Sequence, residues 1–404
     1  MSIVFQLFEK RLVSSRLAVL CVITLLASSS AFAEKWYFEP SVSARLGYND
    51  NVQLSTDSEM ETYTSNITAD AAMGFRTRVS DVSITARMID RRFDDYAYLN
   101  TNNQFIYLKS SYRSGLNLFG LDADYEREST RTSEFDISGF SNTNKIRITK
   151  AISPYFNRTL TERASIRLGG NYTDVTYEDA ELTGLSDYTN RSAYTSLNYS
   201  LSERTSLQAV LSKSLYTSDS TEFDSTSLQL GINHRLSETC SLNALIGPNY
   251  TKSKYTTGST EEEFSDVGKL IDIGLTKQFE LGTFNASLET SESAGGAGKM
   301  TSRTSLKLSL NRKISERTSF DLLGIIQQNE SGGGRKDPND ERTYFSLEPR
   351  VSWQASRWWT VSGSYRYRQS EYTSSDDGPA ESNAVYITVR YVWPKESLSR
   401  WMEL

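Results

Sequence analysis

The sequence has little of the chemistry from which most catalytic and metal sites are built. Its 404 residues include one histidine and two cysteines. Cys21 lies in the apolar segment near the N-terminus, so Cys240 has no partner for an intramolecular disulfide. One imidazole and one thiol exclude a His/Cys metal cluster and a C-x-x-C-H haem site, and the formal net charge of −6 argues against nucleic acid as a partner. We therefore expect no cofactor, no metal and no enzyme activity.

Long hydrophobic runs are absent beyond the N-terminal segment. There, basic residues precede the apolar stretch Leu17–Ala27, and Ala31 and Ala33 follow in the A-x-A arrangement that signal peptidase recognises. The stretch is too short for a transmembrane helix, which needs about 20 residues. We therefore predict that residues 1–33 are a cleaved signal peptide and that the protein is exported.

Aromatic residues, in contrast, are abundant: 23 Tyr, 17 Phe and 6 Trp. An exported, tyrosine-rich chain without a hydrophobic helix is typical of an outer-membrane β-barrel, whose strands alternate in character and so look polar on average. Residues 384–393, "AVYITVRYVW", show this period of two, with Val385, Ile387 and Val389 on one face and Thr388 and Arg390 on the other. Such a face fits lipid, and such a barrel fits the outer membrane of a Gram-negative bacterium.

A short polar motif recurs before alternating runs. It reads "LSERTSL" at 201–207, "LSETCSL" at 236–242 and "ISERTSF" at 314–320, with weaker versions at 160–170 and 354–364 and further breaks near Ser80, Gly115 and Gly282. The breaks recur about every 35–45 residues, the length of a hairpin with two strands of about 10–14 residues, a tight turn and a longer loop. Eight turns and nine polar, mostly acidic loops predict an all-β, antiparallel up-and-down transmembrane barrel of about 18 strands over residues 34–394, with the turns and both termini in the periplasm. Residues 395–404 would be a short periplasmic tail.

Tryptophan and histidine support this orientation. The six tryptophans fall at a terminus or beside the turn predicted at 355–357, so we predict a periplasmic aromatic girdle. Its members would be Trp36, Trp353, Trp358, Trp359 and Trp393. His234 shares the parity of Leu230 and Ile232, which places it on the lipid side and away from any catalytic cleft.

The opposite parity predicts the residues that line the lumen. The basic candidates are Arg45, Arg76, Arg78, Arg87, Arg91, Arg147, Arg167, Lys307, Arg350, Arg366, Arg368 and Arg390. The acidic candidates are Asp70, Asp122, Asp124 and Glu348. Much of this arginine gathers on one wall when the first and last strands meet, where it would either guide an anionic solute or pair with carboxylates and stiffen the barrel.

In its repeated turn motifs and in the stretch "DSTSLQLGINHRLSE" (224–238), the chain resembles outer-membrane β-barrel proteins associated with exopolysaccharide and exosortase gene clusters. That resemblance implies a passive pore for export of an anionic polysaccharide, or a barrel that partners a periplasmic export apparatus, in contact with outer-membrane lipid and lipopolysaccharide. A small-solute diffusion porin and a structural barrel around a partner protein are the alternatives.

Three stretches bear on these alternatives. "SEFDISGF" (133–140) is a poor match to the Pro-Glu-Phe-Gly-Gly stretch in the inward-folded third loop of trimeric general porins, which argues against a size-restricted general porin. The acidic stretch 259–266 is interpreted as a solvated loop rather than a calcium site. The glycine-rich stretch 331–339 is interpreted as a flexible tip rather than a phosphate loop.

Overall fold

Eighteen long antiparallel strands form a closed barrel. The computed structural model describes residues 35–137, 144–179, 183–257, 259–334, 341–374, 378–393 and 396–397. The strands are β1 (Lys35–Asn49), β2 (Thr62–Arg76), β3 (Ser80–Phe93), β4 (Thr101–Ser114), β5 (Asn117–Ser129), β6 (Ile146–Thr159), β7 (Ala164–Glu178), β8 (Tyr188–Ser200), β9 (Thr205–Ser218), β10 (Thr221–Ser237), β11 (Cys240–Thr257), β12 (Thr260–Phe279), β13 (Gly282–Ala294), β14 (Met300–Lys313), β15 (Thr318–Ser331), β16 (Arg342–Gln354), β17 (Trp359–Tyr372) and β18 (Ala380–Val392). A 3-10 helix η1 (Ala97–Leu99), a helix α2 (Thr130–Ile137) and a two-residue strand β19 (Glu396–Ser397) complete the described elements.

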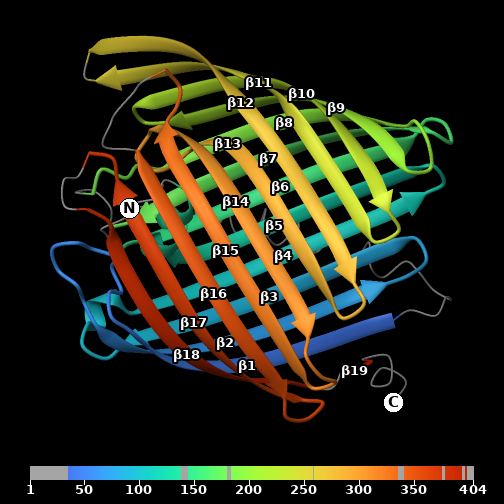
Figure 1. Cartoon of the computed structure of the whole chain (residues 1–404). Helices are drawn as coiled ribbons and strands as arrows, with labels where there is room; N and C mark the ends of the chain where they lie inside the picture. The colour runs from blue at the N-terminus through green and yellow to red at the C-terminus, as the bar shows by residue number, and fades with distance from the viewer. Residues whose placement is uncertain are drawn as a thin grey trace, which may run out of the picture.

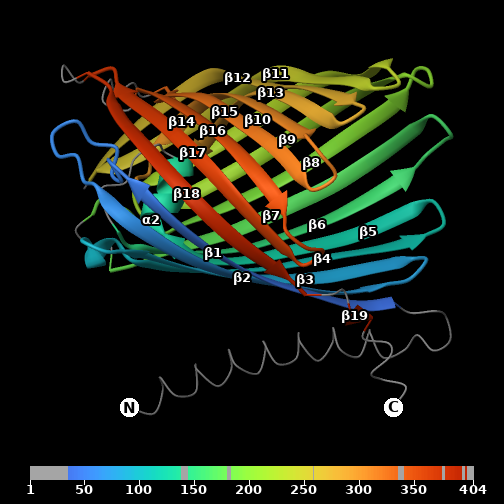
Figure 2. The same ribbon diagram turned by 60° about the horizontal axis from the view of Figure 1, so that its bottom comes forward.

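Each strand pairs with its neighbours in sequence, and β1 pairs with β18, which closes the sheet (Figure 1). Closure leaves no open sheet edge, which is the condition for a sheet to cross a membrane. Eight tight turns lie at one end of the barrel and nine connections at the other, of which seven are longer and two, at 219–220 and 258–259, have only two residues. Figure 2 shows the two ends of the barrel. The predicted all-β up-and-down barrel of about 18 strands is confirmed.

The recurrent polar motif is a hydroxyl-stabilised turn. In the β14–β15 turn, Ser315 Oγ accepts hydrogen bonds from the backbone N–H groups of Arg317 (3.3 Å) and Thr318 (3.1 Å). A hydroxyl that satisfies backbone donors two or three residues ahead replaces bonds that the sheet ladder no longer supplies there. The same arrangement is found at Thr77, Thr161 and Ser356, and in part at Ser202 and Ser237.

We expect Ser315→Ala to lower the free energy of unfolding by about 0.5–1 kcal/mol, because the two exposed amides lose their acceptor. The measurement is the urea midpoint of the barrel in lipid vesicles. Ser206→Ala is the matched control, since its hydroxyl has no hydrogen-bond partner among the described residues and should leave the midpoint unchanged. Equal midpoints for the two variants would show that the motif has no energetic role.

The outer face of the barrel is apolar, and it identifies the inner face by alternation. On β10, Leu228, Leu230 and Ile232 are 50%, 63% and 38% exposed, and on β18 Val385 and Ile387 are 55% and 61% exposed. Because successive side chains point to opposite faces, the residues between these positions point to the lumen. His234 lies on the outer face with the β10 leucines and contacts Thr205 Oγ1 through its Nδ1 at 2.9 Å.

Several strands are longer and several loops shorter than predicted. The strands β10, β11 and β12 have 17, 18 and 20 residues, so 217–224 and the acidic stretch 259–266 belong mainly to hairpins rather than to loops. Most residues on both faces of these hairpins are polar, with Phe223, Tyr255 and Phe264 as exceptions, so alternation does not distinguish a strand from a loop there.

The described part of the chain begins at Lys35 of β1 and ends at Ser397 of β19, both at the turn end of the barrel. Residues 1–33, the predicted signal peptide, lie outside the described residues, as does most of the predicted tail 395–404. Glu396 and Ser397 pair with Phe38 and Tyr37 of β1, so this part of the tail extends the sheet. In the described part of the chain, no helix is long and apolar enough to cross a membrane.

Candidate functional site

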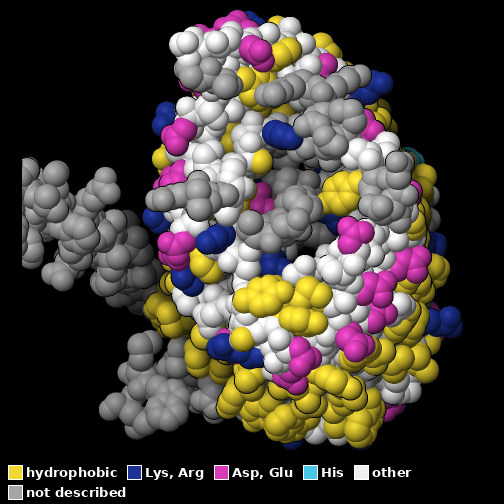
Figure 3. Space-filling view, turned by 90° about the vertical axis from the view of Figure 1, so that its left-hand side faces the viewer, with side chains coloured by type: hydrophobic (Ala, Val, Ile, Leu, Met, Phe, Trp, Pro, Cys, Tyr) yellow, Lys and Arg dark blue, Asp and Glu magenta, His cyan; other side chains and the backbone are white. Residues whose placement is uncertain are grey.

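The inner face carries most of the predicted lumen residues. By alternation from the exposed apolar positions, it includes Arg45, Arg76, Arg87, Arg91, Arg147, Arg167, Lys307, Arg350, Arg366, Arg368, Arg390, Asp70, Asp122, Asp124 and Glu348. Arg78 differs, because it lies in the β2–β3 turn and on neither strand. Figure 3 looks onto the loop end, where the molecule is hollowed and basic side chains are visible around the opening.

Some of these residues are paired across strands. Arg87 Nε lies 2.5 Å from Asp70 Oδ1, and Arg76 Nε lies 2.7 Å from Asp81 Oδ2 near the turn end. Asp122 lies opposite Lys109 in the β4–β5 ladder. These pairs fit the expectation that part of the lumen charge stiffens the barrel.

Four arginines follow the wall formed by β17, β18 and β1, and we call them the arginine track. Arg368 pairs in register with Ser382 of β18, Arg366 with Ala384 and Arg45 with Thr388, while Arg390 belongs to β18 itself. Measured along β18 by these pairings, the four arginines lie between positions 382 and 390, a distance of about 27 Å at about 3.4 Å per residue. The track therefore extends from the loop half of the barrel toward the turn end.

The track arginines are held mainly by neutral groups. Arg366 donates to Tyr386 Oη at 2.6 Å, and Arg368 donates to Ser382 Oγ at 3.1 Å. Arg390 donates to Ser41 Oγ at 3.2 Å. Arg45 differs, because it lies 3.3 Å from Glu348, and that carboxylate is shared with Arg350 at 2.7 Å. Most of the positive charge of the track is therefore not neutralised by carboxylates of the described residues.

Tyr386 organises the centre of the track. Its ring lies 4.2 Å from the Arg45 guanidinium and 5.2 Å from that of Arg366, and it is 5% exposed. The ring lies flat against the wall because its partner in the β1–β18 ladder is Gly47, where any side chain would overlap it. The Tyr386–Gly47 pair thus positions two arginines at once.

Three further cross-strand pairs on the inner face also place a tyrosine opposite a glycine. The pairs are Tyr37 with Gly74, Tyr155 with Gly120, and Tyr194 with Gly169. In each, the aromatic ring covers the glycine of the neighbouring strand, an arrangement that protects a strand glycine. The Tyr155 ring in turn carries the Arg167 guanidinium at 4.2 Å.

A cavity of about 320 Å³ opens beside the track at its loop end. Five arginines line it: Arg45, Arg91, Arg131, Arg366 and Arg368. The described residues that line it include no aspartate or glutamate. Burial lowers the pKa of the Arg131 guanidinium, and repulsion from Arg91 lowers that pKa further. We call this space the arginine cavity.

Helix α2 lies inside the barrel, anchored to the opposite wall by a buried charge network. Arg147 of β6 lies 3.6 Å from Glu134 of α2 and 3.9 Å from Glu128 of β5, and it donates to Tyr188 Oη at 2.8 Å. Tyr177 Oη donates to Glu134 Oε1 at 2.5 Å, and Glu134 is 1% exposed. Residues 130–137 of the third long loop therefore fold inward, although the loop lacks the porin sequence stretch whose poor match argued against a size-restricted general porin.

The β13–β14 hairpin also bends into the lumen. The β12–β13 ladder ends at Ile271 and Thr290, and beyond it Glu292 accepts a 2.6 Å hydrogen bond from Asn249 on the inner face of β11. At the tip, Gly295 accepts a bond from Tyr216 Oη at 2.9 Å, and Gly296 accepts one from the N–H of Ser186 at 2.8 Å. The hairpin thus covers the wall from β7 to β11.

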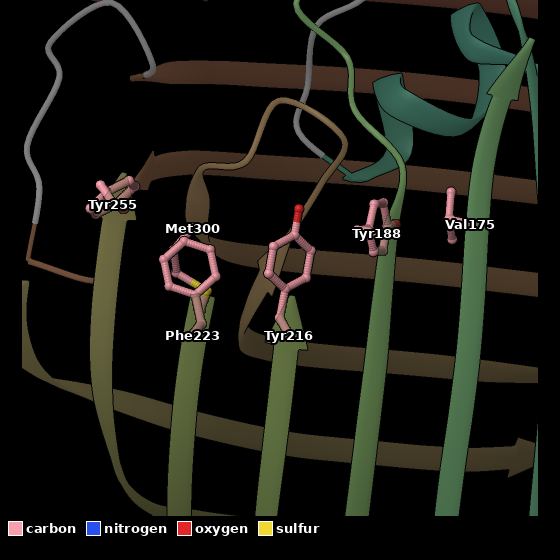
Figure 4. Packing of buried hydrophobic residues seen from close by; sticks show 6 residues of the cluster. All are labelled: Val175, Tyr188, Tyr216, Phe223, Tyr255 and Met300. Atoms are coloured by element: carbon pink, nitrogen blue, oxygen red, sulfur yellow. The ribbon is translucent and has the colours of Figure 1, made fainter. Parts of the chain in front are cut away.

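Beneath this hairpin runs a row of buried, mostly aromatic side chains (Figure 4). It consists of Val175, Tyr188, Tyr216, Phe223 and Tyr255, one each from β7 to β11, with Met300 of β14 packed on it. Consecutive rings lie 4.9, 5.3 and 5.8 Å apart between centroids. This packing fills one side of the lumen at the loop end, whereas the arginine cavity lies on the other side.

Sequence patterns missed Arg131, Tyr386 and Gly47 as parts of this site. Arg131 lies in the connection between β5 and β6, and its position depends on the contact between Glu134 of α2 and Arg147 of β6. The sequence does contain an indication for the Tyr386–Gly47 pair, because a glycine inside a strand often marks a position that a neighbouring group approaches closely.

The predicted girdle tryptophans lie at the turn end. Trp353, Trp359 and Trp393 are 51%, 47% and 42% exposed on the outer face, and Trp359 and Trp393 both contact the Tyr391 ring, at 4.7 and 4.6 Å. Trp36 packs on Phe75 at 4.9 Å, and Trp358 lies in the β16–β17 turn. These positions support the proposal that they lie at the membrane interface.

Comparisons with solved structures return barrels. OccK2 (OpdF) from Pseudomonas aeruginosa aligns with a TM-score of 0.48 and 10% identity over 88% of this chain and 98% of its own. OpdL from the same species gives 0.45 and 11% over 90% and 99%, and the ferric-catecholate import receptor Fiu from E. coli K12 gives 0.46 and 9% over 88% and 81%. No protein-family model and no curated protein matches the sequence.

At such low identities and TM-scores these likenesses carry no argument about substrates, and the fold is established by the strand pairing itself. The closed sheet, its apolar outer face and its polar lumen are those of a transmembrane β-barrel of the outer-membrane type.

Proposed function

We propose that the protein is an outer-membrane channel through which an anionic polysaccharide is exported along the arginine track. The observation that carries this proposal is the ladder of four arginines over about 27 Å of one wall. Charged rings and rails set the selectivity of pores, because an ion of opposite sign is stabilised where it would otherwise lose hydration.

The spacing of the track suits a polymer with repeated charges. Its levels on β18 are separated by two, four and two residues, about 7, 14 and 7 Å. A chain with regularly placed carboxylates can leave one arginine as it reaches the next, so no step requires full loss of charge pairing. Partners on the periplasmic side would meet the turn end, where Glu396, Ser397 and the tight turns lie. A periplasmic export partner is part of this proposal.

A small anionic solute is the second candidate, favoured by the narrowing of the lumen. Helix α2 and the β13–β14 hairpin occupy the β5–β11 side, and the arginine cavity of about 320 Å³ lies beside the track. The same segments leave less room for a partner protein, so we do not favour a structural sleeve.

The test is single-channel recording of the refolded mature protein in a planar bilayer. We expect the reversal potential in a KCl gradient to show that anions permeate better than cations. Acidic oligosaccharides of increasing length, added to the turn side, should block the current in events that lengthen with voltage and then shorten as the chain passes through. Neutral oligosaccharides of the same lengths serve as the control.

Block by a monomer with no passage of longer chains would favour the small-solute porin over export. Cation selectivity would contradict both candidates. In the double variant Arg366→Gln/Arg390→Gln, anion selectivity should fall several-fold, whereas Arg312→Gln, on the outer face with Leu308 and Leu310, should leave it unchanged.

A further inference from the structure

The arginine cavity gathers positive charge from elements that are far apart in the sequence. Arg45 comes from β1, Arg91 from β3, Arg366 and Arg368 from β17, and Arg131 from the inward-folded helix α2. Like charges this close repel one another. The described residues that line the cavity include no carboxylate, although Glu348 lies 3.3 Å from Arg45 outside the lining. Such an arrangement is stable only with compensating negative charge in the cavity or with water.

Several polar atoms of the lining residues are buried and have no hydrogen-bond partner in the described chain. They are Nε of Arg45, Arg366 and Arg368, together with Oγ1 of Thr101 and Oδ1 of Asn66. Most buried polar side-chain atoms in proteins are hydrogen-bonded, so a cluster that is not indicates an absent ligand, ion or water. Three of the five are guanidinium donors, which select oxygen anions.

We propose that the arginine cavity binds a compact multivalent oxyanion, of the polycarboxylate or phosphate class, that bridges α2 to the barrel wall. The volume of about 320 Å³ is at the lower end of the range for small-molecule sites, about 300–1,000 Å³, so the ligand is small. Guanidinium groups arranged around it can each present a planar pair of N–H donors to a carboxylate or phosphate.

The bridge distinguishes this site from the track. Arg45, Arg366 and Arg368 belong to both, but Arg91 and Arg131 line only the cavity, and Arg131 is contributed by α2. A bound anion therefore holds α2 in its inward position and adds to the anchor at Arg147. The inference does not depend on polysaccharide export, because a fixed anion would bind in the same way in a channel for any solute.

Isothermal titration of the refolded, full mature barrel with citrate tests the site, with NaCl held at a constant ionic strength. We expect one citrate per chain, and we expect Arg131→Gln and Arg91→Gln each to weaken the binding about tenfold or more, since each removes charge-assisted hydrogen bonds. Arg167→Gln is the matched control: Arg167 lies on the inner face of β7, stacked on Tyr155, outside the cavity.

Resistance of each variant to SDS without heating verifies that the barrel has folded, and Arg131→Lys, which keeps the charge, should bind more tightly than Arg131→Gln. No citrate binding to the wild type, or equal affinities for wild type, Arg91→Gln and Arg131→Gln, would overturn the proposal. Ion selectivity recorded without citrate distinguishes failure of this site from failure of the proposed function. If the channel is anion-selective but binds no citrate, only the citrate site is refuted. If the barrel binds citrate but is not anion-selective, only the channel function is refuted.

Discussion

Replacing Arg147 by glutamine should release α2 from the wall and raise the conductance of the channel. Arg147 is 7% exposed and lies between Glu128 and Glu134, which are 8% and 1% exposed. Removal of one partner from a buried ion pair typically costs about 3–5 kcal/mol, because the remaining charge is left without compensation. An eight-residue helix has few other contacts to offset such a loss.

Two measurements check this expectation. Single-channel conductance should increase, and trypsin should cleave after Arg131 faster than in the wild type, since the peptide bond becomes accessible when α2 leaves the wall. Arg167→Gln removes an inner-face arginine of the neighbouring strand that has no contact with α2, and it should change neither quantity. Unchanged cleavage and conductance in Arg147→Gln would mean that other contacts hold the helix.

The period of two made the walls of the barrel predictable from sequence. Arg366 and Arg368 alternate with Tyr365 and Tyr367 along β17. When one face of a strand is apolar, this alternation assigns each of its side chains either to the membrane side or to the lumen side. The turns could also be predicted from sequence, because each Ser or Thr hydroxyl accepts hydrogen bonds from backbone N–H groups no more than three residues away. Local rules therefore predicted the strand count, the positions of the tight turns and most inner-face residues.

The contents of the lumen were not predictable in this way. The position of Glu134 depends on Arg147 and Tyr177, and that of Gly296 depends on Ser186, 110 residues away. No periodicity in 130–137 or 295–299 marks these segments as inward-folded, since their anchors lie on other strands. The narrowing of the lumen, and with it the case for a small solute, became visible only in the structure.

Replacing Gly47 by alanine should destabilise the barrel and weaken its anion selectivity together. An alanine Cβ at this position would overlap the Tyr386 ring and lie 2.6 Å from the carbonyl oxygen of Val385. Overpacking of this kind typically costs about 1–3 kcal/mol. Displacement of the ring would remove both the 2.6 Å hydrogen bond to Arg366 and the stacking surface of Arg45.

Gly363→Ala gives the matched comparison. Gly363 also lies inside a strand, β17, but on the outer face, and an added Cβ there meets no atom within 4 Å. Since alanine restricts the unfolded chain, this variant should be as stable as the wild type or more stable by about 0.4–1 kcal/mol, with selectivity unchanged. Urea midpoints in vesicles and reversal potentials in a KCl gradient measure both effects. If Gly47→Ala loses stability but keeps full anion selectivity, Tyr386 only packs against the wall and does not position the arginines. If Gly47→Ala loses both stability and selectivity while Gly363→Ala loses neither, the tyrosine–glycine pair holds the track in place.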